Sequence, residues 1–139
     1  MPPGRFDEAT QEHILRRSDG GAALIERLGW VPSFHDYAVE QLTLSSDSPS
    51  SLVLWIRRPA HQERVTFTLF EVIDTQFEYF GQVNILVDLQ LRSAPHRPER
   101  TPWCSGTPSD TDVEFSFGSG DGLSGWLRCR RFAVALEFI

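Results

Sequence analysis

His35 and Asp36 are the side chains in this sequence that come closest to an acid–base pair. A carboxylate can orient an imidazole and raise its basicity, which prepares a general base. Neighbouring residues on an extended segment point to opposite faces, so the two side chains diverge if this segment is a strand. We therefore interpret the pair as structural. The alternative is a small hydrolase or an anionic-ligand-binding domain in which Arg128 or Arg130 holds the anionic group.

Other catalytic and metal-binding patterns are weak. Gly118-Ser119-Gly120 lacks the flanking elements of a nucleophilic serine or a phosphate-binding loop. Cys104 and Cys129 are isolated thiols without C-x-x-C spacing. The histidines are too scattered to predict a shared metal ion; they are His13, His35, His61 and His96. We therefore expect no catalytic residue, no metal site and no cofactor.

An acidic and aromatic segment lies between Arg64 and Arg92, where the chain carries no basic residue. Aromatic side chains anchor protein interfaces, and negative charge steers basic partners toward them. The plainer alternative is a solvated rim over core aromatics. The candidate partner contacts in this segment are Glu71, Asp74, Glu78, Tyr79 and Phe80.

A basic group, Arg128, Arg130 and Arg131, falls on the last predicted strand. We expect these arginines to pair with carboxylates inside the protein or to face solvent. An anion site is the alternative interpretation of the same group.

Two helical segments and a run of strands must position these residues. The apolar pattern predicts helices over 6–17 and 22–28, with Asp19-Gly20-Gly21 as the N-cap and Gly29 as the C-cap of the second. From Phe34 onward the apolar period changes to two, which predicts strands. The expected strands cover residues 37–44, 52–57, 65–70, 83–92, 113–117 and 126–138. Changes of parity predict a bulge in the first strand, and a bulge or burial of both faces in the last.

The connecting segments carry further expectations. Residues 1–5 read as a disordered lead-in, and residues 93–110 as a long Pro-rich surface loop. Within the irregular segment 71–82, Phe77, Tyr79 and Phe80 would cap an open end of the sheet. The strand 83–92 shows the cleanest alternation, with Val83, Ile85, Val87, Leu89 and Leu91 expected on one face.

These elements predict an α+β fold in a single domain, 1–139. One or two N-terminal helices would pack on a single twisted antiparallel sheet of about six or seven strands, connected as a meander. A chain of 139 residues is long enough to bury a core of its own.

Composition bears on the partners and the compartment. The formal net charge of −6 repels nucleic acid, so no nucleic-acid partner is expected. No stretch is apolar enough for a membrane span or a secretory leader, which predicts a soluble, cytoplasmic protein.

The junction between the second predicted helix and the first strand is rich in special residues. We interpret Trp30, Pro32, Phe34, His35 and Asp36 as a structural motif, in which Trp30 and Phe34 plug the end of the sheet and Pro32 fixes the turn. The pattern Trp30-x-Pro32-Ser33-Phe34-His35-Asp36-x-x-Val39 resembles the signature of the immunity protein 50 family of bacterial polymorphic-toxin systems. The strands at 52–56, 65–70 and 83–89 and the pattern Gly125-x-x-x-Cys129 agree with that resemblance.

The resemblance covers residues 29–138 and implies a function. A member of this family would be a small cytoplasmic protein, not an enzyme, that binds and neutralises a cognate protein toxin. The acidic segment would suit a basic toxin. A structural module of a larger assembly is a further alternative, and the sequence does not predict the oligomeric state.

Overall fold

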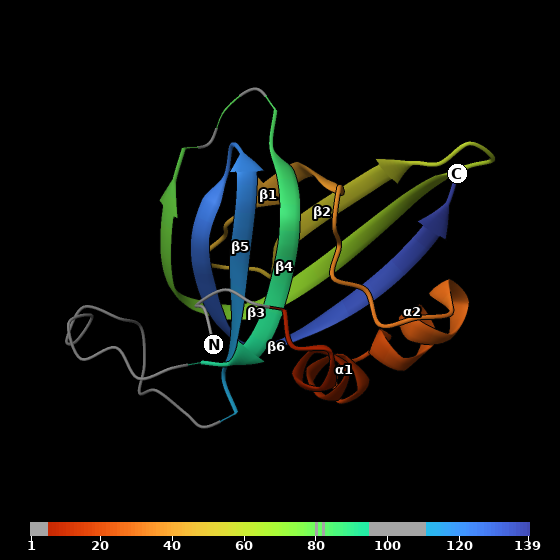
Figure 1. Ribbon diagram of the computed structural model, residues 1–139. Coiled ribbons are helices and arrows are strands. Elements are labelled where there is room, and N and C mark those ends of the chain that lie inside the picture. The colour runs from red at the N-terminus through yellow and green to blue at the C-terminus, as the bar shows by residue number, and fades with distance from the viewer. Residues whose placement is uncertain (1–5, 80, 82, 95–110) are drawn as a thin grey trace.

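Six antiparallel strands and two helices make up the part of the chain that the computed structural model describes, residues 6–79, 81, 83–94 and 111–139 (Figure 1). The expectations for residues 1–5, for Phe80, for Cys104 and for nearly all of the Pro-rich segment lie outside these residues. The elements are α1 (Glu8–Arg16), α2 (Gly21–Leu28), β1 (Ala38–Thr43), β2 (Ser50–Arg57), β3 (Gln62–Glu78), β4 (Ile85–Ser93), β5 (Val113–Asp121) and β6 (Ser124–Phe138).

The strands are ordered β1-β2-β3-β6-β5-β4, and β4 returns to β1 to close a barrel. The expected α+β fold with an antiparallel sheet is confirmed. The connectivity differs from a single meander: β1 to β3 form one hairpin series, β4 to β6 form another, and β6 pairs with β3. Closure removes most of the free edges that an open sheet of these strands would leave to solvent.

Local signals set the helix ends. α1 begins after Asp7, whose carboxylate accepts a hydrogen bond from the Thr10 backbone N–H at 3.2 Å. α2 ends at Gly29, where the backbone turns into the left-handed region and its N–H donates to Ile25 O at 2.8 Å. The N-cap of α2 is Gly20, and no side chain caps that end. A Cβ at Gly20 would lie 2.0 Å from Val134 O, so the turn packs directly on the β6 backbone.

Two strands differ from expectation. β3 continues through the segment expected to cap an open end and pairs with β6 as far as Glu78, after a register shift between Val72 and Asp74. In β4 a register shift between Leu86 and Asp88 turns Val87 outward, where it is 50% exposed, while Leu86 and Leu89 are buried. A bulge of this kind moves every later side chain to the other face, which alternation along the chain cannot reveal.

The parity changes that the sequence does show are confirmed. In β1 the register with β2 shifts between Val39 and Gln41. In β6 both faces are buried over Leu127, Arg128 and Cys129. This part of β6 also pairs with β3 along one edge and with β5 along the other.

The core combines the barrel interior with the inner faces of the helices. Ile14 and Leu15 of α1 and Leu24 of α2 are fully buried in it. At its centre, Phe67 packs edge to face against Phe34 and Phe115 at centroid distances of 5.6 and 5.2 Å, an arrangement that aromatic rings prefer. A chain of aromatic contacts therefore joins the junction after α2 to β3 and β5; it runs through Phe34, Tyr37, Phe67, Phe115 and Phe132.

The junction before β1 closes the barrel. Strands β1 and β4 share a single register pair, Ala38 with Ile85. Backbone hydrogen bonds continue the seam: Asp36 N–H donates to Leu86 O at 2.9 Å, and Leu86 N–H donates to Tyr37 O at 2.9 Å. Leu89 N–H donates to Ser33 O at 2.8 Å. The segment that the sequence marked as special therefore runs along β4 as the last edge of the barrel.

A buried glutamine ties α1 to this seam. The Gln11 side-chain amide donates to Pro32 O at 3.1 Å and to Leu89 O at 2.8 Å, and its carbonyl accepts from Leu91 N–H at 2.7 Å. The side chain is fully buried, so water cannot reach these backbone groups to take over its hydrogen bonds. Gln11 thereby joins the helix, the junction and β4 through one side chain.

Replacing Gln11 with leucine tests that role. We expect Gln11→Leu to lower the free energy of unfolding by roughly 3 kcal/mol, because three backbone groups lose their partner in a buried site. The exposed Gln41→Leu should change it by less than about 0.5 kcal/mol. Urea denaturation measures both, and equal effects of the two variants would contradict the role of Gln11.

Gly20 and Gly29 form a matched pair for a second test. Both have a φ of 86°, but a Cβ at Gly29 would meet nothing within 4 Å. We expect Gly29→Ala to cost about 1–2 kcal/mol through backbone strain alone. Gly20→Ala should cost about 4 kcal/mol, because the clash with Val134 O adds to the strain. Thermal unfolding of the two variants would refute this packing if their midpoints were the same.

Candidate functional site

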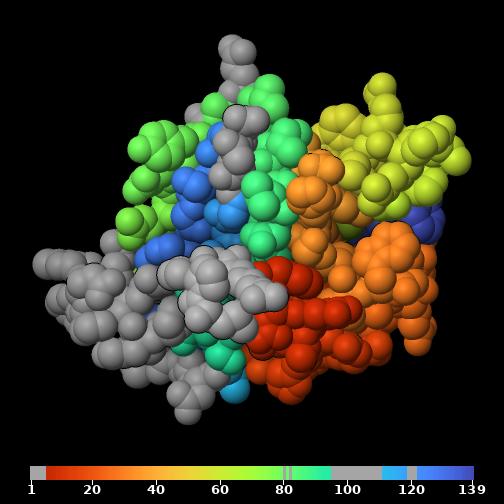
Figure 2. Space-filling view, viewed as in Figure 1, coloured from red at the N-terminus to blue at the C-terminus, as the bar shows by residue number. Residues whose placement is uncertain are grey.

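The predicted partner contacts gather on the second half of β3, which we call the β3 flank (Glu71 to Tyr79). Figure 1 shows this part of β3 as the outermost strand on the left of the barrel, and its green atoms lie at the upper left of the space-filling view in Figure 2. Tyr79 is 78% exposed, and the side chains of Glu71 and Glu78 are also exposed. Three of the five candidate residues are therefore exposed to solvent along this flank.

The other two candidates differ from these. Asp74 is half-buried, its carboxylate accepts from Thr75 N–H at 2.9 Å, and it lies opposite Arg128 in the pairing of β3 with β6. Asp74 therefore takes part in the protein's own polar contacts. Phe80 lies outside the described residues.

The β3 flank is also an edge of the sheet. Strand β2 pairs with β3 only as far as Leu69, whereas β6 pairs with β3 as far as Glu78. Among the described residues, no strand pairs with the other edge of β3 beyond Leu69. Glu71, with a φ of 57°, and the register shift that follows it bend β3 at the start of the flank. Phe77 holds the flank to the barrel by an edge-to-face contact with Phe117 at 5.6 Å.

His35 and Asp36 correct an expectation. The segment is a turn rather than a strand: Phe34 and Asp36 have φ values of 61° and 68°. This brings His35 Nε2 to 3.5 Å from Asp36 Oδ1, while His35 Nδ1 lies 2.7 Å from Val87 O. The side chains therefore approach each other instead of diverging, because positive φ abolishes the alternation of an extended chain.

The pair does not meet the arginines of the hydrolase or anion-binding alternative. His35 contacts the carbonyl of Val87 on β4. The next residue of β4, Asp88, pairs with Gly118 near the end of β5. Arg130 instead binds Asp112, just before β5 begins. Six residues of strand separate these positions, or about 20 Å at 3.3 Å per residue. His35 and Asp36 are both about two-thirds exposed, at the surface of the seam.

The expected internal pairing holds for Arg130. Arg130 Nη1 lies 2.9 and 3.0 Å from the two carboxylate oxygens of the fully buried Asp112. Arg128 is buried in β6 between its register partners, Asp74 on β3 and Glu114 on β5. Arginine thus balances charge on the side of the barrel formed by β3, β6 and β5.

The rest of the junction motif has mixed outcomes. Phe34 is fully buried and plugs the core as expected, and Pro32 is buried with its carbonyl bound by Gln11. Trp30 is 56% exposed, so its expected role as a second plug is wrong. The reason is its place in the bend after Gly29, where the chain leaves α2 and turns back toward β4.

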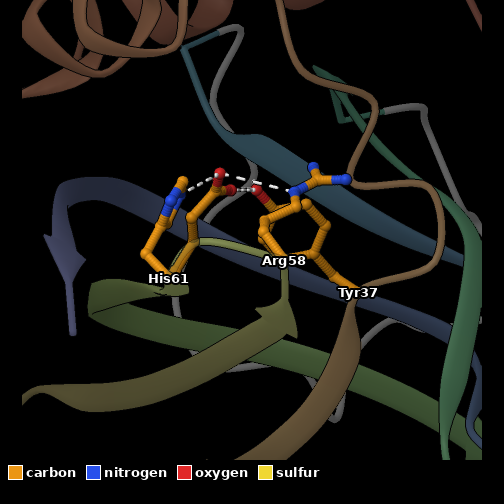
Figure 3. Close-up of polar contacts among 4 residues, drawn as sticks. Tyr37, Arg58 and His61 are labelled. Atoms are coloured by element: carbon orange, nitrogen blue, oxygen red, sulfur yellow. Dashed lines mark hydrogen bonds and ion pairs between the residues drawn. The ribbon is translucent and has the colours of Figure 1, made fainter.

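A buried carboxylate that the sequence analysis missed lies at the end of the β2–β3 hairpin. Figure 3 shows Tyr37, Arg58 and His61 pointing toward one carboxylate, that of Glu63. The Tyr37 hydroxyl donates to Glu63 Oε2, while Arg58 Nε and His61 Nε2 lie 3.4 and 3.1 Å from Oε1. Glu63 lies between two predicted strands, and nothing in the sequence around it indicates that it is buried. Tyr37 precedes β1 and Glu63 lies on β3, so their contact is set by the tertiary structure.

The electrostatics of this cluster hold Glu63 in its charged form. Burial raises the pKa of the Glu63 carboxyl. The hydrogen bonds from Tyr37 and His61 and the charge of Arg58 together lower this pKa by more than burial raises it, so it lies below the usual value. Burial first, and then Glu63, raise the pKa of Tyr37. Both oxygens of Glu63 accept from protein donors. The cluster therefore joins the hairpin to the junction rather than presenting a free base.

The remaining chemical groups are buried or dispersed. Burial, aided by the charge of Asp112, raises the pKa of the Cys129 thiol to about 12, which makes it a poor nucleophile. No three His, Cys, Asp or Glu side chains gather as metal ligands in the ranges that the structure describes. None of the described helices is long and apolar enough to cross a membrane.

Comparisons with known proteins find no counterpart to this arrangement. No protein-family model matches the chain. No curated protein matches it by sequence, and no solved structure matches it by fold.

Glu63 makes stability depend on pH in a defined direction. Because its folded-state pKa lies below the usual 4.5, its contribution is complete above about pH 4.5 and is lost as pH falls through the folded-state value. We expect Glu63→Gln to lower the free energy of unfolding at pH 7 by about 1–3 kcal/mol and to flatten its fall below pH 4.5.

The control for this prediction is Glu40→Gln. Glu40 contacts Arg64 at 3.2 Å on the surface, where such a pair is worth less than about 1 kcal/mol. Urea denaturation from pH 7 to pH 3 compares the variants. An unchanged acid dependence in Glu63→Gln would contradict the role given to Glu63.

Proposed function

We propose that this protein is a non-enzymatic immunity protein of the bacterial cytoplasm, which binds and neutralises a cognate toxin through the β3 flank. The observation that carries the proposal is the exposed, acidic and aromatic character of the flank. The resemblance of the Trp30–Val39 segment to an immunity protein family supports the same conclusion. The toxin would present a basic surface to this acidic flank.

The chemistry of the flank suits a protein partner. Tyr79 offers a large amphipathic ring whose contact area is mostly in solvent, and tyrosine is among the residues that dominate binding energy at interfaces. Glu71 and Glu78 flank the segment with negative charge, which accelerates encounter with a basic partner. No described strand pairs with this edge of β3 beyond Leu69, and an extended segment of the partner can pair with backbone N–H and C=O groups along such an edge.

Pairing with a second copy is less favourable for this surface. Each copy would bring the exposed carboxylates of Glu71 and Glu78, and two proteins of net charge −6 repel each other. The acidic flank therefore favours a basic partner over self-association.

Co-expression tests the proposal. The protein is expressed in bacteria together with the toxin encoded by the neighbouring gene, and growth is measured. We expect the wild-type protein to restore growth and to bind the purified toxin in calorimetry. Full toxicity beside folded protein would overturn the proposed function.

Variants of the flank test the surface. Tyr79→Ala and Glu78→Arg should each weaken toxin binding by about tenfold or more, because they remove an aromatic anchor and reverse a charge. Glu26→Arg makes the same charge change on the exposed face of α2 and should bind as the wild type does. If the wild type binds and all three variants match it, the toxin contacts another surface.

A further inference from the structure

A pocket opens between the end of α1 and the strands β5 and β6, with a volume of about 230 Å³. Its floor is apolar and buried; it consists of Ile14, Val113 and Phe132. Three arginines also line it: Arg17, Arg130 and Arg131. In a protein of net charge −6, this is a local concentration of arginine over an apolar surface.

Arg131 is held in place without using its hydrogen-bond donors. Its guanidinium carbon lies 4.0 Å from the centre of the Phe70 ring, a stacked cation–π contact. Among the described residues, Arg131 makes this ring contact and no hydrogen bond or ion pair. A stacked guanidinium keeps its planar set of N–H donors at its edge, where a carboxylate or phosphate group can accept from two of them.

Arg17 and Arg130 are each fixed by the protein through one terminal nitrogen. Arg17 Nη2 donates to Thr111 O at 3.3 Å, and Arg130 Nη1 binds the buried Asp112. Arg130 Nε lies 3.8 Å from Glu71, an ion pair too long for a hydrogen bond. Each of these arginines is therefore oriented by the fold and keeps further N–H groups for a ligand.

The charges around the pocket limit the ligand. Three carboxylates, those of Asp112, Glu71 and Asp19, lie beside the three arginines. These charges balance, so a ligand would be held by the oriented N–H donors of Arg17 and Arg131 and not by a surplus of positive charge. One oxyanion group can accept from these donors, whereas a polyanion would be repelled by the carboxylates.

We propose that the pocket binds a small organic molecule that carries one oxyanion group, a carboxylate or a phosphate monoester, on an apolar body. The arginines bind the oxyanion and the buried floor receives the apolar body. The volume is sufficient, since a cavity of about 150 Å³ admits benzene. This inference does not depend on the proposed function, because it involves a different surface and a different class of ligand.

Four small probes test the proposal by isothermal calorimetry and by amide chemical shifts at low salt. Phenyl phosphate and benzoate carry the oxyanion on a ring, benzyl alcohol lacks the charge, and inorganic phosphate lacks the ring. We expect one of the first two to bind at least tenfold more tightly than benzyl alcohol and inorganic phosphate. The stronger of the two identifies the oxyanion.

Variants locate the binding. Arg131→Gln and Arg17→Gln should each weaken binding of the stronger probe by about tenfold, and both side chains are exposed, so the fold should persist. Arg57→Gln removes the same charge from the exposed end of β2 and should leave binding unchanged. The proposal is overturned if neither anion binds below about 10 mM. It is equally overturned if benzyl alcohol binds as well as the anions, or if Arg57→Gln weakens binding as much as the pocket variants do.

Discussion

The hydrogen bonds between the junction and β4 are the constraint on which the rest of this structure depends. β1 and β4 share one register pair, so the barrel is closed mainly by the segment before β1, from Ser33 to Val39. Gln11 secures that segment from α1, and Phe34 secures it from the core. The helix, the seam and the aromatic centre are therefore linked by direct contacts, and we expect them to unfold together.

Closure also decides what remains exposed. Strands β3 and β6 are longer than their neighbours, so β2 pairs only with the first half of β3, and no other described strand pairs with that edge of the second half. The bend at Glu71 separates this flank from the first half of the strand, while Phe77 keeps it attached to β5. The surface that we propose for partner binding is thus a consequence of unequal strand lengths in a closed sheet.

Charge is divided between two regions of the molecule. Exposed carboxylates mark the β3 flank, whereas arginines line the pocket beneath α1, and Glu71 lies close enough to Arg130 to connect the two. The buried carboxylates Glu63, Asp112 and Glu114 each have an arginine within ion-pair distance, which avoids the large cost of an isolated buried charge. Acidic groups at the surface can therefore act on partners, while the buried ones stabilise the fold.

The sequence by itself determined the element types and most of their positions, because apolar periodicity and capping residues act locally: α2 with Gly29 at its end, the alternating strands and the bulge in β1 all follow from neighbours in the chain. It also marked the junction as special. Only the tertiary structure decided that this junction closes a barrel, that Val87 faces outward, that His35 approaches Asp36, and that Glu63 lies against Tyr37. Each of these depends on a positive φ, on a bulge that the apolar alternation of β4 hides, or on a contact between distant strands, and the order of residues shows none of them.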